Sequence, residues 1–297
     1  MKAALLFALL GAARPWEAAP SVPPQWVGPA RPAAGAKIER VVSLAPSVTE
    51  TLFALGRGDR VVGVSRFDDR PAEVATLPKV GGFTDPNVEA IVALRPDLVL
   101  AAANASNRPG LERLSALGIP VYAVPGNSLA DVFVATRAVA ERMGAEAEAE
   151  RVLAALSARL EAATARRRGA VKVLVVFGHD PLVAAGPGSL ADTVLGILGA
   201  RNAAGGVDKP YPQLGPEALV MAQPDVIIDA TGEHGVAQSA PWRGLDGIPA
   251  VKRGRIHALP LATLLRPSPR LMEGVEALDA LLWPPAPLAP APAAPAP

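Results

Sequence analysis

The stretch from Asn127 to Arg168 most constrains the fold, because it contains no proline and a single glycine, Gly144. Ser128, followed three residues later by Asp131, predicts a capping box at the start of a first helix. Gly144 is typical of a helix end. The apolar spacing then restarts and predicts a second helix of about 24 residues, about 36 Å long. We therefore interpret 127–168 as a short helix followed by a rigid helix that bridges two lobes.

Strands alternate with helices on both sides of this stretch, which predicts an α/β fold of two Rossmann-like lobes with parallel sheets, joined by one long backbone helix. The lobes span 38–126 and 169–283. An internal repeat supports this division, because EAIVALRPDLVLAA at 89–102 matches EALVMAQPDVIIDA at 217–230. Two alternatives stay open: a crossover helix inside one large domain, and chance similarity between helix-turn-strand units.

The two ends of the chain differ in composition from its centre. Residues 1–19 predict a signal peptide, with cleavage after Ala13 or, preferably, after Ala19. Residues 20–37 predict a Pro/Ala-rich linker, and residues 284–297 predict a disordered Pro/Ala tail. The absence of cysteine excludes disulfides and a lipid-anchored cysteine, so we expect a soluble protein in the periplasm. A formal net charge of +1 gives no indication of a nucleic-acid partner.

Aromatic side chains gather in the loops that follow predicted strands. Phe67, Phe83, Phe177 and Tyr211 all lie there, although aromatic residues make up only 4% of the chain. Ligands of open α/β folds bind outside the carboxyl ends of the strands, and aromatic faces stack on planar ligands. The alternative for each residue is an anchor in the core beneath its loop.

The chain offers little for catalysis or metal binding. Its histidines, His179, His234 and His257, are too scattered for a zinc or manganese site. No G-x-S-x-G elbow, cysteine nucleophile or phosphate-binding loop is present. Ser47, with Glu50 three residues later, predicts a helix N-cap with a capping box. We therefore expect no catalytic residue, no metal and no cofactor.

Glu89 and Glu217 occupy equivalent positions in the two repeats, each at the start of a predicted helix. The simplest interpretation is a carboxylate favoured by the helix dipole, worth about 0.3–1 kcal/mol. The more specific interpretation is a symmetric pair of docking charges, one on each lobe.

Several of these segments together resemble one family. The segments are RVVSLAPSVTE from Arg40, VGVS from Val62, VGGF from Val80, NVEAIVALRPDLV from Asn87 and GIPV from Gly118. They are similar to periplasmic substrate-binding proteins of the helical-backbone class (class III), which serve ABC importers of cobalamin, haem and ferric siderophores. The run 62–99 looks most like the cobalamin-binding (vitamin B12) branch.

The resemblance implies that a ligand, cobalamin or a related corrinoid, is held between the lobes of a monomer. It places ligand contacts at Phe67, Phe83, Phe177, Gly178, Tyr211, Arg266 and Ser268. It also implies that Glu89 and Glu217 pair with arginines of a permease dimer in the inner membrane.

This chain departs from the pattern at four positions. Two tryptophans of the family appear as Phe83 and Tyr211, a third appears as Ala102, and an acidic position appears as Leu265. A haem or ferric-siderophore receptor is the alternative within the family. A secreted α/β hydrolase using a serine and His179 is the alternative outside it.

Overall fold

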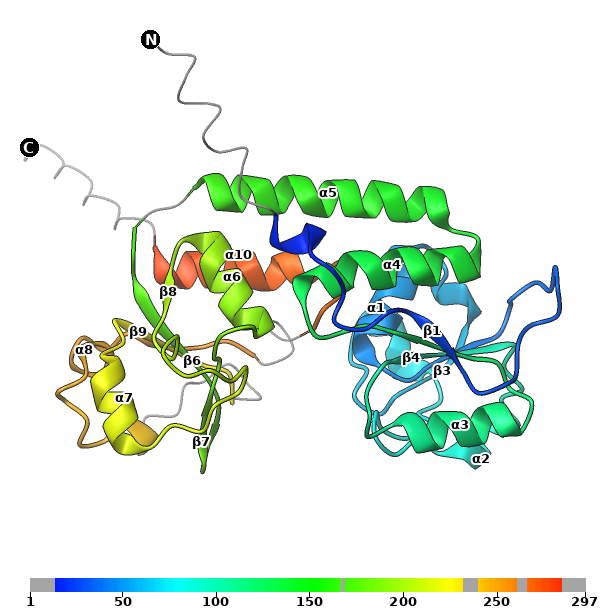
Figure 1. Cartoon of the computed structure of the whole chain (residues 1–297), viewed down its shortest axis with the longest axis horizontal. Helices are drawn as coiled ribbons and strands as arrows, with labels where there is room; N and C mark the ends of the chain where they lie inside the picture. The colour runs from blue at the N-terminus through cyan, green and yellow to red at the C-terminus, as the bar shows by residue number, and fades with distance from the viewer. Residues whose placement is uncertain (1–13, 167–168, 232–239, 261–265, 285–297) are drawn as a thin grey trace, which may run out of the picture.

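The computed structural model describes residues 14–166, 169–231, 240–260 and 266–284. Two lobes lie side by side, and two stacked long helices run along one side of both (Figure 1). This arrangement confirms the predicted α/β fold of two lobes joined by a long helix. Four hydrophobic clusters form the core, one on each face of each sheet, so each lobe has its own core.

The first lobe is built on a five-stranded sheet in the order β1-β5-β4-β2-β3. Four strands are parallel, as expected for strands that read as unbroken apolar runs. They are β2 (Val41–Ser43), β3 (Val61–Val64), β4 (Leu98–Ala102) and β5 (Val121–Val124). The helices of this lobe are α1 (Pro46–Ala54), α2 (Val88–Ala93) and α3 (Arg108–Ala116).

The second lobe has a sheet in the order β10-β9-β6-β7, with the short β8 also paired to β6. Among the described strands of this sheet, β7 alone runs antiparallel to its neighbour. The strands are β6 (Lys172–His179), β7 (Leu182–Ala184), β8 (Arg201–Asn202), β9 (Val226–Asp229) and β10 (Ile256–Ala258). The helices are α6 (Leu190–Leu198), α7 (Pro216–Ala222), α8 (Pro249–Lys252) and α10 (Leu271–Leu282).

The two stacked helices are α4 (Leu129–Met143) and α5 (Glu146–Ala165). The predicted capping box is present at Ser128 and Asp131, and Gly144 ends α4 in the left-handed conformation at φ 61°. The bridging helix α5 has 20 residues, fewer than predicted, because the helix ends at Ala165. Its buried leucines pack with residues of β6 and α6. Among the described residues, no helix combines the length and the apolar character of a membrane span.

The internal repeat has a structural counterpart in the pairs α2–β4 and α7–β9. Each pair is a short helix, a turn and a buried parallel strand. Arg95 and Gln223 stand at the same place in the two turns, each directly before a proline. Both adopt a positive φ, 45° and 43°, which non-glycine residues seldom do. The same uncommon backbone geometry at matching positions supports the interpretation of the repeat as two similar units.

The prediction of a linker over 20–37 is wrong for part of that segment. Residues Gln25–Val27 form β1, an edge strand that pairs antiparallel with β5. The indole of Trp26 packs edge-on against Tyr122, with ring centroids 4.9 Å apart. Flanking prolines are compatible with this position, because an edge strand tolerates residues that cannot donate to a second neighbour. Residues 285–297 of the predicted tail, and residues 1–13 of the predicted leader, lie outside the described residues.

Candidate functional site: a cleft between the lobes

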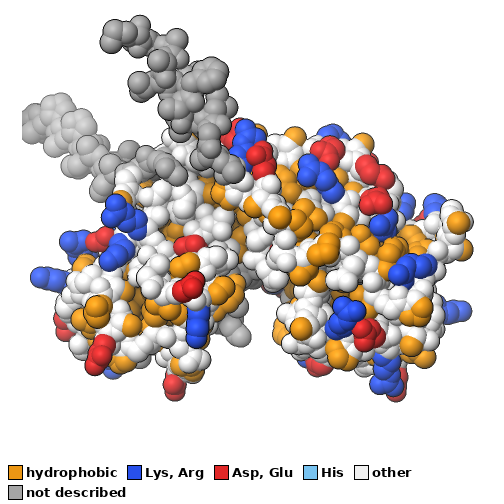
Figure 2. Space-filling model, in the orientation of Figure 1, with side chains coloured by type: hydrophobic (Ala, Val, Ile, Leu, Met, Phe, Trp, Pro, Cys, Tyr) orange, Lys and Arg blue, Asp and Glu red, His pale blue; other side chains and the backbone are white. Residues whose placement is uncertain are grey.

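A cavity of about 310 Å³ lies where the two lobes face each other. Figure 2 shows the surface hollowed between the lobes. Its walls come from the segments after β2, β4 and β5 and from Phe83 in the first lobe, and from the start of α6 and two loops in the second lobe. The lining residues are Ala45, Pro46, Ser47, Phe83, Ala102, Ala103, Asn104, Gly126, Asn127, Leu190, Tyr211, Arg266 and Pro267. The lining is therefore mostly apolar with a few amides, as in many small-molecule sites.

Aromatic rings stand at this cavity and at its mouth. Phe83 and Tyr211 line it from opposite lobes. Phe177 lies behind Tyr211, with ring centroids 5.8 Å apart. Phe67 and Tyr211 are 55% and 49% exposed, although large aromatic side chains normally bury most of their surface. The structure therefore brings three of the four predicted aromatics together and leaves Phe67 uncovered near Arg266, whose Nη2 donates to the Phe67 carbonyl oxygen at 3.4 Å.

Gly178 and Ser268, which are also predicted ligand contacts, do not line this cavity. Gly178 lies in β6, where a side chain would approach the Pro181 carbonyl oxygen at 3.3 Å. Ser268 is buried, and its hydroxyl group donates to Oε2 of Glu50 at 2.5 Å. Contact between a ligand and any of the seven residues stays a prediction.

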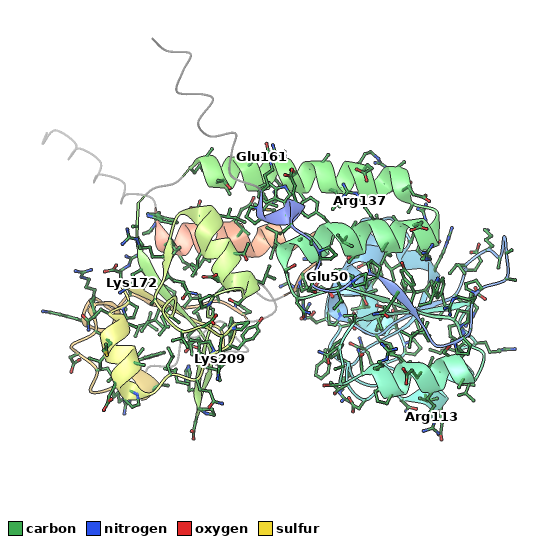
Figure 3. The ribbon with its side chains drawn as sticks, in the orientation of Figure 1. Glu50, Arg113, Arg137, Glu161, Lys172 and Lys209 are labelled. Atoms are coloured by element: carbon green, nitrogen blue, oxygen red, sulfur yellow. The ribbon has the colours of Figure 1, made fainter. Side chains whose placement is uncertain are left out.

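Glu50 lies at the centre of a polar network that joins the lobes (Figure 3). Its side chain is buried, and its carboxylate accepts hydrogen bonds from Arg266 at 3.0 Å and from Ser268. The predicted capping box is wrong here, because α1 begins at Pro46 with Ala45 as its N-cap and no side-chain cap. Ser47 is therefore inside the first turn and Glu50 is the fifth helical residue, too far along the helix to bond the N–H of the N-cap residue.

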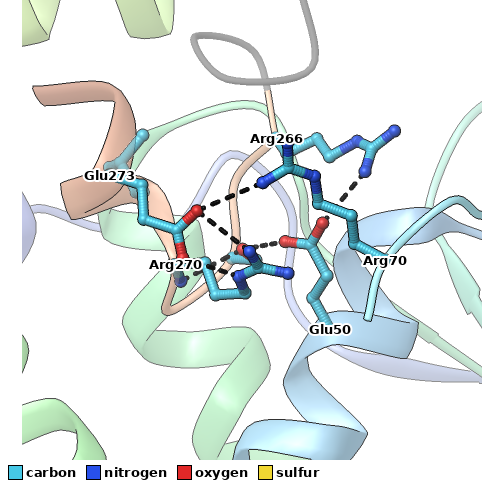
Figure 4. Close-up of a pocket in the computed structure, with 7 residues that line it drawn as sticks. Glu50, Arg70, Arg266, Arg270 and Glu273 are labelled. Atoms are coloured by element: carbon cyan, nitrogen blue, oxygen red, sulfur yellow. Dashed lines mark hydrogen bonds and ion pairs between the residues drawn. The ribbon is translucent and has the colours of Figure 1, made fainter. Parts of the chain in front are cut away.

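Four arginines beside the cleft are paired with carboxylates, and Figure 4 shows three of them, Arg70, Arg266 and Arg270. The pairs are Arg66–Asp85 at 2.6 Å, Arg70–Glu273 at 3.4 Å, Arg270–Glu273 at 2.9 Å, Arg266–Glu50 at 3.0 Å and a close Arg266–Asp69 contact. A small cavity of about 30 Å³ lies among Glu50, Arg70, Arg266, Arg270 and Glu273. The network is therefore internally neutralised, and it presents no free guanidinium among the residues just named.

Burial and pairing shift the pKa values of these groups in opposite directions. Desolvation alone would raise the pKa of Asp69, but the hydrogen bond and the charge of Arg266 outweigh it and the pKa is lowered. Desolvation alone would lower the pKa of Arg266, but Asp69 and Glu50 hold it above its usual value. Burial raises the pKa of the Tyr211 phenol. Asp69 and Arg266 therefore both carry their charges at neutral pH, and Tyr211 is a neutral phenol.

Sequence reasoning missed several residues of this cleft. Glu50 and Asp69 hold Arg266, and the amides of Asn104 and Asn127 line the cavity. All four lie in or beside the segments that directly follow predicted strands. A place after a predicted strand indicates a cleft residue, because the carboxyl ends of parallel strands meet at one edge of the sheet.

His179 does not form a hydrolytic site with a serine. Its Nε2 lies 3.2 Å from Oδ1 of the buried Asp229 and 3.4 Å from the Thr231 hydroxyl group. These are the polar partners of its ring among the described residues, and the Thr231 hydroxyl donates to Asp229 at 2.6 Å. His257 lies in β10, and His234 lies outside the described residues. In the described part of the chain, no three His, Asp or Glu side chains lie together as a metal site.

Glu89 and Glu217 occupy the same position, the second residue, in α2 and α7. Both are exposed, and neither forms an ion pair with another described residue. The two helices lie in different lobes, on the side of the molecule away from α5 (Figure 1). Val92 and Val220, three residues after each glutamate, are exposed as well. The two lobes thus present matching carboxylates with an apolar neighbour, and a role in docking stays a prediction.

Comparison with known proteins identifies the family. The sequence profile described as "Periplasmic binding protein" matches residues 41–262. A Bacillus subtilis protein named as an uncharacterized ABC transporter substrate-binding lipoprotein, YvrC, is 32% identical over 256 residues, which are 83% of this chain and 80% of that protein.

Two solved structures share the fold over most of the chain. The periplasmic vitamin B12 binding protein BtuF of Vibrio cholerae has a TM-score of 0.71 and 28% identity, covering 82% of this chain and 96% of that one. The periplasmic heme-binding protein RhuT from Roseiflexus sp. RS-1, in its apo form, has a TM-score of 0.72 and 30% identity, covering 82% and 97%. The chain belongs to the periplasmic binding protein family of ABC transporters, and it is a substrate-binding transport protein rather than an enzyme.

Proposed function

We propose that this protein is the periplasmic solute-binding component of an ABC importer and that it captures cobalamin or a related corrinoid between its lobes. The cavity with Phe83 on one lobe and Tyr211 on the other carries this proposal. A corrin ring offers a broad planar face, and aromatic side chains stack on such faces. The exposed rings of Phe67 and Tyr211 extend the apolar surface beyond the cavity, so a ligand larger than the cavity would cover them.

The charge pattern favours a ligand without net charge. Cyanocobalamin is electroneutral and its edge carries amide groups, which suit the amides of Asn104 and Asn127. Haem carries two propionates, and many ferric siderophores are anionic. An anionic ligand would have to separate Arg266 from Glu50 and Asp69, or Arg66 from Asp85. Separating Arg266 from the buried Glu50 leaves an uncompensated charge, which costs several kcal/mol, whereas the Arg66–Asp85 pair is exposed and contributes little.

Haem is the second candidate, and Tyr211 is the observation that favours it. A tyrosine phenolate binds haem iron in some proteins, and the Tyr211 ring stands in the cavity wall. Iron binding would require the phenol to lose its proton, and burial raises the pKa of Tyr211. Because haem also carries two propionates, and the arginines named above are already paired with carboxylates, haem is the weaker candidate.

Titration of the purified protein with cyanocobalamin, haemin and a ferric siderophore in parallel tests the proposal. We expect cyanocobalamin to bind with Kd below about 1 μM, equivalent to about −8 kcal/mol. Tight binding of haemin, with no heat or spectral change on addition of corrinoids, would reverse the assignment.

Variants localise the binding to the cleft. Phe83→Ala and Tyr211→Ala each remove a ring that lines the cavity. We expect each to weaken cyanocobalamin binding about tenfold, since an aromatic contact is worth about 0.5–1.5 kcal/mol. Leu117→Ala is the matched control, because Leu117 is also an exposed apolar residue but ends α3 away from the cavity. An equal loss in the control would show that the effect is not local.

Delivery and export complete the proposed function. The start of the chain carries the features of a leader that directs the chain to the periplasm, with one lysine, a short apolar run and small residues after it. The permease would then meet Glu89 and Glu217, one carboxylate from each lobe, through arginines on its two subunits. Both steps are consistent with a solute-binding component that passes its ligand to a two-fold transporter.

A further inference from the structure

Residues 14–27, which we call the N-terminal strap, are built into the fold. Trp16 is only 6% exposed and belongs to the same hydrophobic cluster as residues of α4, α5 and β6. Its indole ring stacks on Phe133 of α4, with ring centroids 6.4 Å apart and planes inclined by 16°. Arg14 forms an ion pair of 3.2 Å with Glu161, which Figure 3 labels on α5. The strap therefore begins against the pair of helices that joins the lobes.

The middle of the strap satisfies a buried carboxylate. Asp131 is fully buried at the start of α4. The backbone N–H of Ser21 donates to one of its oxygens at 2.7 Å, and the Ser21 hydroxyl group donates to the other at 2.6 Å. Asn127 and Ser128 donate to the same carboxylate through their backbone N–H groups. Without Ser21 the carboxylate would lose two of its donors, which a buried charge tolerates poorly.

The end of the strap covers the edge of the first sheet. There β1 pairs with β5 in the register Gln25 to Ala123 and Val27 to Val121. An unpaired sheet edge is a site for association with other chains, and covering it removes that risk. The strap thus contacts α4, α5 and the first sheet in one continuous run.

From this integration we propose that the leader peptide is removed between Ala13 and Arg14, so that the whole strap stays in the mature protein. This processing site rests on the export step of the proposed function. A leader peptidase would hydrolyse the Ala13–Arg14 bond with one water molecule, leaving a carboxylate on Ala13 and an α-ammonium group on Arg14. Arg14 lies beside the carboxylates of Glu17 and Glu161, so the new positive charge forms in acidic surroundings.

The sequence around the two candidate bonds agrees with this position. Leader peptidases require small residues one and three positions before the cut. Ala13 and Gly11 fill these positions for a cut after Ala13, whereas Glu17 occupies the third position before Ala19. A cut after Ala19 would also remove Trp16 and open a hole over Phe133 in the core. Both the residues before the bond and the packing of Trp16 therefore favour a cut after Ala13 over a cut after Ala19.

Intact-mass analysis and N-terminal sequencing of the exported protein test the site. The full chain with a C-terminal tag is expressed in a Gram-negative host and recovered from the periplasm. We expect a chain that begins at Arg14. A chain that begins at Pro20, or that keeps residues 1–13, overturns the proposal. The same sample is titrated with cyanocobalamin, so that failure of the cleavage site and failure of the binding function are scored separately.

Two pairs of variants sharpen the result. Ala13→Gln places a large side chain before the bond and should abolish the Arg14 start, whereas Ala19→Gln should leave it unchanged. In chains made without a leader, a start at Pro20 should lower Tm by about 5 °C or more relative to a start at Arg14. Glu17→Ala, an exposed change in the same turn, is the control and should shift Tm by less than about 1 °C. Equal Tm values for the two starts would contradict a structural role for Trp16.

Discussion

The hydroxyl group of Ser268 donates a 2.5 Å hydrogen bond to Oε2 of Glu50, and this contact joins residues 218 positions apart in the sequence. Glu50 belongs to α1 of the first lobe, whereas Ser268 directly precedes α10 of the second. Both side chains are buried, and Glu50 is 3% exposed. Parting the lobes at this point would leave a buried carboxylate without its donors, so the contact resists opening beside the ligand cleft.

The first prediction concerns this contact. Ser268→Ala should reduce the free energy of unfolding by about 1–3 kcal/mol, because it removes a donor from a buried carboxylate. Urea denaturation at neutral pH measures the effect. Arg159→Ala is the control, since it breaks an exposed pair with Glu276 of 2.8 Å and should cost less than about 1 kcal/mol. Equal costs for the two variants would mean that Ser268 contributes no more than a surface contact.

The second prediction concerns Asp68, which is buried in the segment that follows β3. Burial raises its pKa despite a 2.5 Å hydrogen bond from the Ser65 hydroxyl group, and its Oδ1 has no partner among the described residues. Its folded pKa therefore lies above the unfolded reference of 3.8. The stability that protonated Asp68 contributes is complete below that reference and is lost as the pH rises through the folded pKa.

Asp68→Asn removes this titration. The free energy of unfolding of the variant, minus that of the unmodified protein, should therefore grow as the pH rises from about 4 to about 7.5. A series of urea denaturation curves measures the difference. Asp246→Asn, a change at an exposed carboxylate with no ion pair to a described residue, should give a difference that does not vary with pH. A constant difference for Asp68→Asn as well would show that its pKa is not raised.

Local patterns predicted most of the fold. The capping box at Ser128, the helix end at Gly144 and the repeat of helix, turn and strand each depend on neighbouring residues only. Because such signals are contained within a few residues, they can be read from the sequence. The position of Phe83 and Tyr211 at the cleft followed from their places after strands and from the family resemblance.

Contacts between distant segments could not be read in this way. Glu50 looked like part of a capping box, but its partners lie more than 200 positions away on the other lobe. The strand Gln25–Val27 is only three residues long and lies among prolines, so its composition indicated a linker. Its pairing with β5 and the burial of Trp16 depend on the surface that the rest of the chain offers.

The third prediction separates the two candidate ligands at Tyr211. Tyr211→Phe keeps the ring in the cavity wall and removes only the phenol oxygen. Cyanocobalamin affinity should change less than about threefold, because ring stacking is retained. If haemin bound through the phenolate, its Soret band would shift in this variant. A loss of cyanocobalamin affinity of about tenfold or more would mean that the hydroxyl group, not the ring, makes the main contact.

The fourth prediction concerns motion. The lobes are joined by α5, by the Glu50–Ser268 contact and by the N-terminal strap along α4 and α5. A stiff helix allows less hinge bending than flexible strands do. The radius of gyration from solution scattering should therefore be the same, within error, with and without cyanocobalamin. A clear decrease on ligand addition would show that the lobes close around the ligand.

The last prediction concerns Glu89 and Glu217. These carboxylates are exposed at equivalent positions of α2 and α7, and α2 and α7 lie on the side of the molecule away from α5. Changing both to alanine should leave fold and cyanocobalamin affinity almost unchanged, since an exposed charge at a helix start contributes less than about 1 kcal/mol. Complex formation with the cognate permease, or transport, should nonetheless fall sharply.

Charge reversal at both positions should be worse than alanine, because lysines would then face the arginines expected on the permease. Glu146→Ala is the matched control, since Glu146 is also an exposed glutamate in the first turn of a helix but lies on α5, on the opposite side of the molecule. That variant should dock and transport normally. If the double alanine variant of Glu89 and Glu217 instead loses cyanocobalamin binding while still docking, these residues serve the ligand and not the permease. The matching positions of Glu89 and Glu217 would then need a different explanation, because a ligand held between the lobes does not require matching charges on the outer helices.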